Sequence, residues 1–106
     1  MPSNQADGYA RDGVVLPFKP VGAHTQNASL SAVVELTVPA GANQWMVQTQ
    51  TKNVRFTLDE ATAATTTKGF LLVADAAPVI VPVFPGQVIH VIEVATTATL
   101  DYQFGA

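Results

Sequence analysis

The two histidines are the first residues to test for chemistry, because an imidazole can bind a metal or carry a proton near neutral pH. His24 lies in a polar segment near the N-terminus, whereas His90 lies in a strongly apolar run. A protein metal site needs three or four ligands with supporting partners, and neither histidine has a His-x-His partner or clustered carboxylates beside it. We therefore expect no metal site. His90 is better interpreted as a packed or interface histidine with a hydrogen-bonded neighbour.

The hydroxyl and carboxyl side chains form no catalytic pattern either. The serines all lie near or before the first clear strand pattern, and the G-x-S-x-G turn that exposes a nucleophilic serine is absent from the sequence. Asp59 and Glu60 form the only adjacent acidic pair, and neighbouring residues of a strand point to opposite faces. We therefore expect that the protein is not an enzyme and that it uses no cofactor.

Charge is scarce in this chain and is not organised for a charged partner. Of the 106 residues, 12% are charged and 48% are hydrophobic, whereas an ordinary globular domain is ~25% charged. The five basic residues are scattered and form no stripe that would neutralise phosphates, so we expect no nucleic-acid partner. The surface must be covered by Thr, Gln, Asn and Ala, or by other subunits.

The sequence also lacks the features of a membrane protein or a disulfide-stabilised scaffold. No apolar stretch approaches the ~20 residues that span a bilayer, and no basic segment followed by an apolar run opens the chain. No cysteine is present, which excludes disulfides and thiolate metal sites. We expect a soluble single domain, made in a cytoplasm, without a membrane partner, and stabilised by packing or assembly.

Alternating apolar and polar residues predict that the chain is all-β. The predicted strands recur every 8–12 residues, roughly, and are dominated by Val, Ile and Thr, which is typical of a β-sandwich or jelly roll. We expect seven to eight short antiparallel strands in one domain over residues 29–106, after an extended arm over residues 1–28. The predicted strands are Leu30–Val38, Gln44–Gln50, Asn53–Asp59, Phe70–Val73, Val79–Phe84, Gln87–Val94 and Thr99–Phe104.

Proline and glycine mark the breaks between these strands. Pro82 interrupts an apolar run and predicts an edge strand or a bulge, because proline cannot donate to a ladder. Pro85 and Gly86 predict a turn. The Thr-rich segment Ala61–Thr67 has no apolar face and is predicted to be a loop.

Several strand residues are candidates for contact between subunits. Trp45 is expected to be a core or rim aromatic, or alternatively a platform on which a sugar stacks. Arg55 is expected to point outward, toward a cross-strand partner or an acid of another protomer, and Glu35 and Glu93 are expected to point outward or to pair across strands. The run Val88–Val94 is nearly continuously apolar, as in a strand buried on both faces or facing a subunit. The interface candidates are Arg55, Ile89, His90, Val91 and Trp45.

The first 28 residues show neither helical nor strand periodicity. Pro17 and Pro20 favour an extended backbone on either side of Phe18. The segment is either a partly disordered tail, as termini commonly are, or an arm whose VVLPF sequence docks on the capsid or a neighbouring subunit. In the second case the contact residues are Val14, Val15, Leu16 and Phe18.

An ordered set of motifs covers more than half of the chain. A V-R-F strand runs into a Thr-rich loop closed by Gly, a GFLL strand follows, and later come an I-x-V-I strand and a final A-T-L strand. The pattern resembles a family of small tailed-phage virion proteins, although Glu60 stands where the family usually has Gly. The matching residues are Val54, Arg55, Phe56, Leu58, Asp59, Thr65, Thr66, Gly69, Phe70, Leu71, Leu72, Gly86, Ile89, Val91, Ile92, Ala98, Thr99 and Leu100.

The resemblance implies a β-sandwich protein that is often trimeric and serves as a head decoration or cement protein, a head fibre, or a minor head or tail component. Our first hypothesis is a trimeric capsid decoration protein of the virion, assembled in the host cytoplasm, which stabilises the head by bridging major capsid subunits. The alternative is a tail- or fibre-associated module that recognises a host surface carbohydrate through Trp45 and the Thr-rich loop.

Overall fold

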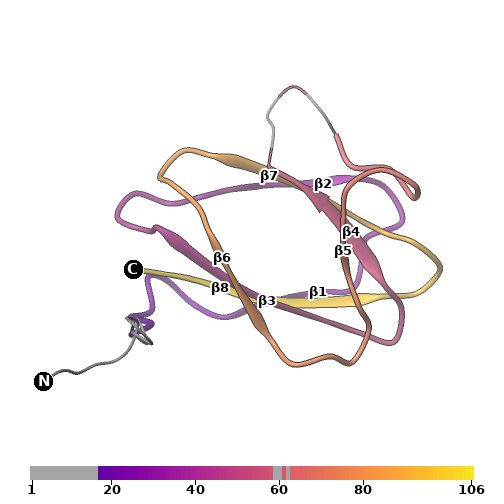
Figure 1. Cartoon of the computed structure of the whole chain (residues 1–106), viewed down its shortest axis with the longest axis horizontal. Coiled ribbons are helices and arrows are strands. Elements are labelled where there is room, and N and C mark those ends of the chain that lie inside the picture. Colours follow the sequence, from indigo (N-terminus) through magenta and orange to yellow (C-terminus); the bar gives the residue numbers. More distant parts are fainter. Residues whose placement is uncertain (1–16, 59–60, 62) are drawn as a thin grey trace, which may run out of the picture.

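The computed structural model describes residues 17–58, 61 and 63–106, and within these residues the chain forms eight β-strands and no helix (Figure 1). This result confirms the all-β prediction. The strands are β1 (Thr25–Asn27), β2 (Val34–Thr37), β3 (Gln44–Gln50), β4 (Val54–Thr57), β5 (Phe70–Leu72), β6 (Val79–Pro82), β7 (Val88–Glu93) and β8 (Thr99–Gly105).

The strands form two four-stranded antiparallel sheets, a first sheet with the order β1-β8-β3-β6 and a second sheet with the order β2-β7-β4-β5. The first strand pairs with the last, the second with the seventh, the third with the sixth and the fourth with the fifth, as in one long hairpin folded back on itself. This strand order is that of a jelly roll. In Figure 1, β2 and β7 lie along the top of the molecule and β1, β3 and β8 along the bottom.

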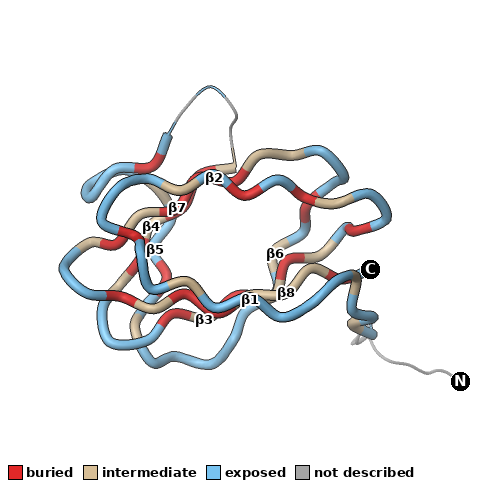
Figure 2. The backbone as a smooth tube through the Cα atoms, turned by 180° about the vertical axis from the view of Figure 1, so that it is seen from behind, coloured by how far each residue is buried: buried red, intermediate tan, exposed pale blue. Residues whose placement is uncertain are grey.

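Apolar side chains between the two sheets form the core. Burial alternates along β3, so that Trp45, Val47 and Thr49 point inward and the glutamines point outward, as the sequence predicts. The Trp45 ring meets the ring of Phe56 in the second sheet edge-on, with centroids 5.3 Å apart, and therefore ties the sheets together. Figure 2 shows that the buried residues lie mainly on the strands and the exposed residues on the loops between them.

The beginning of β2 and the end of β7 differ from the prediction. β2 begins at Val34 rather than at Leu30, although Leu30 is fully buried outside the strand. Glu93 does not point outward: its side chain is 5% exposed, and its carboxylate accepts the backbone N–H of Ala98 at 3.0 Å. The carboxylate supplies the acceptor that this turn between β7 and β8 needs, because a buried N–H without a partner is costly.

The segment that was predicted to be an arm is partly built into the first sheet. β1 lies within residues 1–28 and pairs with β8. Upstream of it, Lys19 and Ala106 exchange two backbone hydrogen bonds of 3.0 and 2.8 Å, and the N–H of Val21 donates to the carbonyl of Phe104 at 2.8 Å. The predicted domain boundary at residue 28 does not match this pairing, because residues 17–28 form an edge of the sandwich.

β5 and β6 are edge strands, and the prediction of an edge strand at Pro82 is confirmed. The N–H of Val83 donates to the carbonyl of Asn43 at 3.0 Å, toward β3. Since backbone direction alternates along an antiparallel ladder, Pro78, Ile80 and Pro82 face the free side of β6. Only Ile80 among these three can offer an N–H there, so the edge is poorly suited to pairing with another strand.

Candidate interaction surface

Three of the predicted interface residues lie in the core. Trp45, Ile89 and Val91 are each 0% exposed, with their side chains between the two sheets. They cannot contact a second subunit unless the sandwich opens. The burial of Trp45 also removes the proposed platform for a stacked sugar, because no face of the indole reaches the surface.

His90 lies on the outer side of the second sheet and is 3% exposed. Its Nε2 donates to the carboxylate of Glu35, which is paired with it across β2 and β7, at 3.2 Å. The histidine therefore has its hydrogen-bonded neighbour within the same chain. Its Nδ1 has no hydrogen-bond partner among the residues that the structure describes.

Arg55 points outward from β4 and holds the loop that leads into β5. Its Nε donates to the carbonyl of Thr66 at 3.2 Å and its Nη1 to the carbonyl of Gly69 at 2.9 Å. At the tip of this loop, Thr65 and Lys68 exchange two backbone hydrogen bonds. The guanidinium thus orders part of the Thr-rich loop of its own chain, which the sequence did not indicate.

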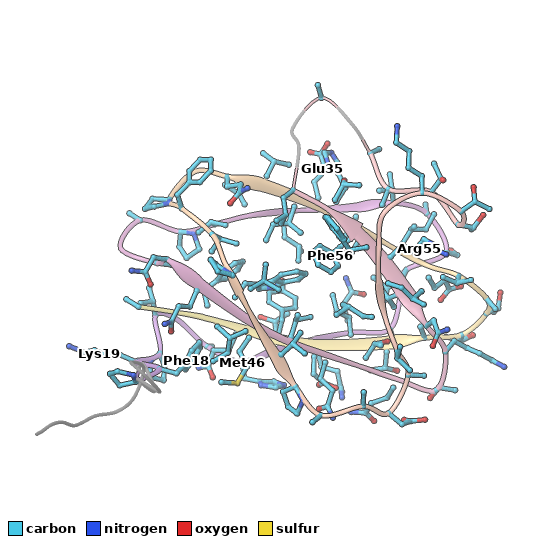
Figure 3. All side chains as sticks on the ribbon, in the orientation of Figure 1. Phe18, Lys19, Glu35, Met46, Arg55 and Phe56 are labelled. Carbon is cyan, nitrogen blue, oxygen red and sulfur yellow. The ribbon has the colours of Figure 1, made fainter. Side chains whose placement is uncertain are left out.

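Phe18 packs against Gly105 at the end of β8. A Cβ built at Gly105 would come within 2.5 Å of the Phe18 ring and 2.9 Å of the Lys19 carbonyl, so the ring occupies the space that a side chain would take. Of the four predicted arm contacts, Phe18 is thus held by its own domain. Val14, Val15 and Leu16 lie outside the described residues. Figure 3 shows Phe18, Lys19 and Met46 toward the same end of the molecule.

Within residues 17–58, 61 and 63–106, no group of three or more His, Asp and Glu side chains is placed to hold a metal ion. The same residues contain no helix with the length and apolar character needed to cross a membrane.

A polar network covers the outer side of the first sheet. Asp101 of β8 accepts three side-chain hydrogen bonds: from His24 at 3.1 Å and Gln26 at 3.0 Å through Oδ1, and from Gln50 at 2.6 Å through Oδ2. These donors come from β1, the segment just before it, and β3, on both sides of β8. The Asp101 carboxylate therefore fixes the edge strand β1 to the middle of the sheet.

Replacing Asp101 by Asn is expected to lower the free energy of unfolding by about 1–3 kcal/mol, because hydrogen bonds to a charged acceptor are worth about that much. An amide has one acceptor oxygen and cannot serve all three donors. Urea denaturation measures the loss, and amide hydrogen exchange should rise at Thr25–Asn27. Asp75→Asn is the matched control, since Asp75 accepts a single backbone N–H, at 3.3 Å, in an exposed turn. Equal effects from the two variants would contradict the role of Asp101.

A second outward-facing feature is a strip of exposed apolar side chains along β5 and β6. We call it the apolar edge, and its members are Phe70 (68% exposed), Leu71 (44%), Val73 (58%), Val79 (45%) and Ile80 (45%). Asp75 is the only charged residue between Gly69 and Pro82. Exposed apolar side chains gathered in one place mark an interaction surface.

A groove runs through the apolar edge between the two sheets. It has a volume of about 180 Å³ and is lined by Val47, Leu71, Leu72, Val73 and Val79, with Gln48, Thr49, Ala76 and Ala77 completing its walls. An apolar cavity of about 150 Å³ can hold a group the size of benzene. The groove therefore has room for one or two aliphatic side chains.

The apolar edge was not predicted from the sequence. The runs Phe70–Val73 and Val79–Phe84 predict strands, and their apolar residues would be expected to lie covered, because apolar runs normally face a core. A signal was nevertheless present, since Pro78 precedes β6, Pro82 ends it, and prolines at these positions mark an edge. β5 is the edge strand of the second sheet and lies on the same side of the sandwich as β6. This arrangement follows from which strands pair with one another, and the sequence pattern does not predict that pairing.

Comparison of the chain with family models, with curated proteins and with solved structures gave no match. The class of this protein is therefore defined by its own fold, which is an all-β jelly-roll sandwich with one apolar edge.

Proposed function

We propose that this chain is a structural protein of a tailed-phage virion, a trimeric capsid decoration protein that stabilises the head by bridging major capsid subunits. The observation that carries the proposal is the apolar edge, where five large apolar side chains are 44–68% exposed. A surface of this kind, in a chain with 12% charged residues, suits burial against other subunits.

Two further features support an assembly role. The jelly roll is a common architecture of viral capsid proteins, although it also occurs in lectins, so it supports the proposal only by analogy. The motif resemblance between Gln44 and Phe104 supplies the link to tailed-phage virions. The competing carbohydrate-binding function relied on Trp45 and the Thr-rich loop, and the full burial of Trp45 leaves it without the aromatic ring on which a sugar would stack.

The oligomeric state of the purified protein tests the assembly part of this proposal. Sedimentation equilibrium is expected to give three times the 11.1 kDa chain mass. A Leu71→Gln, Val79→Gln variant should sediment as a monomer, because amides in the apolar edge would lose their water on association without gaining partners. Val33→Gln is the control, since Val33 is similarly exposed, at 39%, outside the apolar edge. A monomeric parent protein would contradict the trimer.

The location on the particle tests the virion part separately. Cryo-electron microscopy of virions made with and without this gene should differ by density on the head at positions where capsid subunits meet, and heads without the protein should release DNA at lower temperature. Density on the tail, or virions of identical composition, would overturn the assignment to capsid decoration.

A further inference from the structure

We infer that the groove in the apolar edge is the docking site for residues Val14–Leu16 of a second copy of this chain, so that neighbouring copies are joined by exchange of their N-terminal segments. This inference rests on the assembly part of the proposed function. The contact that holds the copies together would be Val14–Leu16 of one copy in the groove of its neighbour.

The groove selects an aliphatic occupant. Its walls are mostly Val and Leu side chains, and its volume of about 180 Å³ suits one or two aliphatic groups rather than a larger ligand. Asp75, the one charged residue of the surrounding segment, directs its carboxylate to the backbone N–H of Thr51, so it has a partner outside the groove. Val14, Val15 and Leu16 are the one aliphatic run in the chain before the described residues.

The free side of β6 argues against simple edge-to-edge pairing of two sandwiches. Of Pro78, Ile80 and Pro82, only Ile80 has an N–H to offer a partner strand. An occupant must therefore bind mainly through its side chains. A short extended segment meets this requirement, and Leu16 precedes a proline, which favours an extended backbone.

The chain's own Val14, Val15 and Leu16 cannot reach the groove. Lys19 is hydrogen-bonded to Ala106 on the side of β8 that faces β1, so three strand spacings lie between Lys19 and β6. Gly105 pairs with Gln44 of β3 and Val79 pairs with Val47, so Lys19 and Val79 are also about four residues apart along the strands. At ~3.4 Å per residue and ~4.8 Å per strand, this separation is about 20 Å. Fully extended chain covers ~3.5 Å per residue, so from Lys19 even Val14 reaches only about 17 Å in a straight line. The aliphatic run must come from another copy.

Cysteine crosslinking tests the exchange directly, because the natural chain contains no cysteine. Val15→Cys and Val79→Cys chains are coexpressed as full-length protein, purified and treated with a short bis-maleimide. Mass spectrometry should show links between position 15 of one chain and position 79 of the other as the main product. The control replaces Val79→Cys by Val33→Cys, which has similar exposure, and should lose most of that product.

Two outcomes would overturn the inference: equal crosslinking to positions 79 and 33, or links in the Val15→Cys, Val79→Cys double variant that stay within one chain at high dilution. A second readout is the mass of a Val14→Ser, Val15→Ser, Leu16→Ser variant, which should fall from trimer to monomer while its circular-dichroism spectrum, and so its fold, is unchanged. Both measurements use the purified protein, so exchange without binding to heads would leave the inference standing and overturn the virion function alone.

Discussion

Replacing Trp45 by Ala is expected to lower the free energy of unfolding by about 3–5 kcal/mol, the usual cost of removing a buried large aromatic. Trp45 is 0% exposed and meets two aromatic rings edge-on, Phe56 at 5.3 Å and Tyr102 at 6.4 Å. The void would lie between the sheets, where neither sheet can close it without separating from the other. Since a domain of this size is stable by only about 5–15 kcal/mol, the variant should be partly unfolded at moderate temperature.

Urea denaturation followed by circular dichroism measures this loss, and Trp45→Phe is the matched control. Phe keeps an aromatic ring in the core and removes the indole Nε1–H, which has no acceptor among the described residues. An unpaired buried N–H costs about 1–3 kcal/mol, so its removal offsets part of the lost packing. The Phe variant should therefore lose less than half of what the Ala variant loses. A near-neutral Ala variant would contradict the position of Trp45 in the core and restore a surface role for it.

Replacing Gly69 by Ala is expected to cost about 2–4 kcal/mol, because a conformational penalty and a steric penalty of about 1–2 kcal/mol each act at this position. Gly69 has a φ of 130°, which L residues rarely adopt, and an added Cβ would lie 2.9 Å from the carbonyl oxygen of Phe56. That oxygen belongs to β4 and cannot move away without disturbing the pairing of β4 with β5. The Gly69 carbonyl also accepts the bond from Arg55, so the Thr-rich loop should loosen as well.

Gly41→Ala is the control for this prediction. Gly41 also has a positive φ, 85°, but nothing lies within 4 Å of the Cβ that would be added. It should therefore show only the conformational cost, about 1–2 kcal/mol. Urea denaturation compares the two variants, and amide exchange over residues 63–69 reports the loop. If the two glycines cost the same, the close contact with Phe56 does not exist in solution.

The strand pattern is the part of the fold that could be read directly from the sequence. Along β3 and β4, the alternation of apolar and polar residues correctly predicts that Trp45 and Val54 point inward and Gln48 outward. Pro82 correctly predicts an edge strand. These are local properties, since period two assigns a residue to a face and proline removes a donor wherever it occurs.

The candidate site was less predictable, because it depends on what covers each face. Ile89 and Val91 were expected at a subunit interface, yet the second sheet buries them against the first. Glu93 lies on that same buried face. The turn after β7 brings the N–H of Ala98 to its carboxylate, and this hydrogen bond lowers the cost of burying the side chain. A hydrophobic run indicates burial but does not say whether the covering surface belongs to the same chain.

By itself, the sequence determined the all-β class, the approximate strands, the turns and the scarcity of charge. The tertiary structure alone decided that residues 17–27 lie along β8 and that Asp101 accepts hydrogen bonds from three segments of the chain. It also decided that the apolar side chains of β5 and β6 are exposed at one edge of the sandwich. The physical reason is sequence separation: Gln26 and Asp101 are 75 residues apart, and local periodicity carries no information about which distant strands will pair.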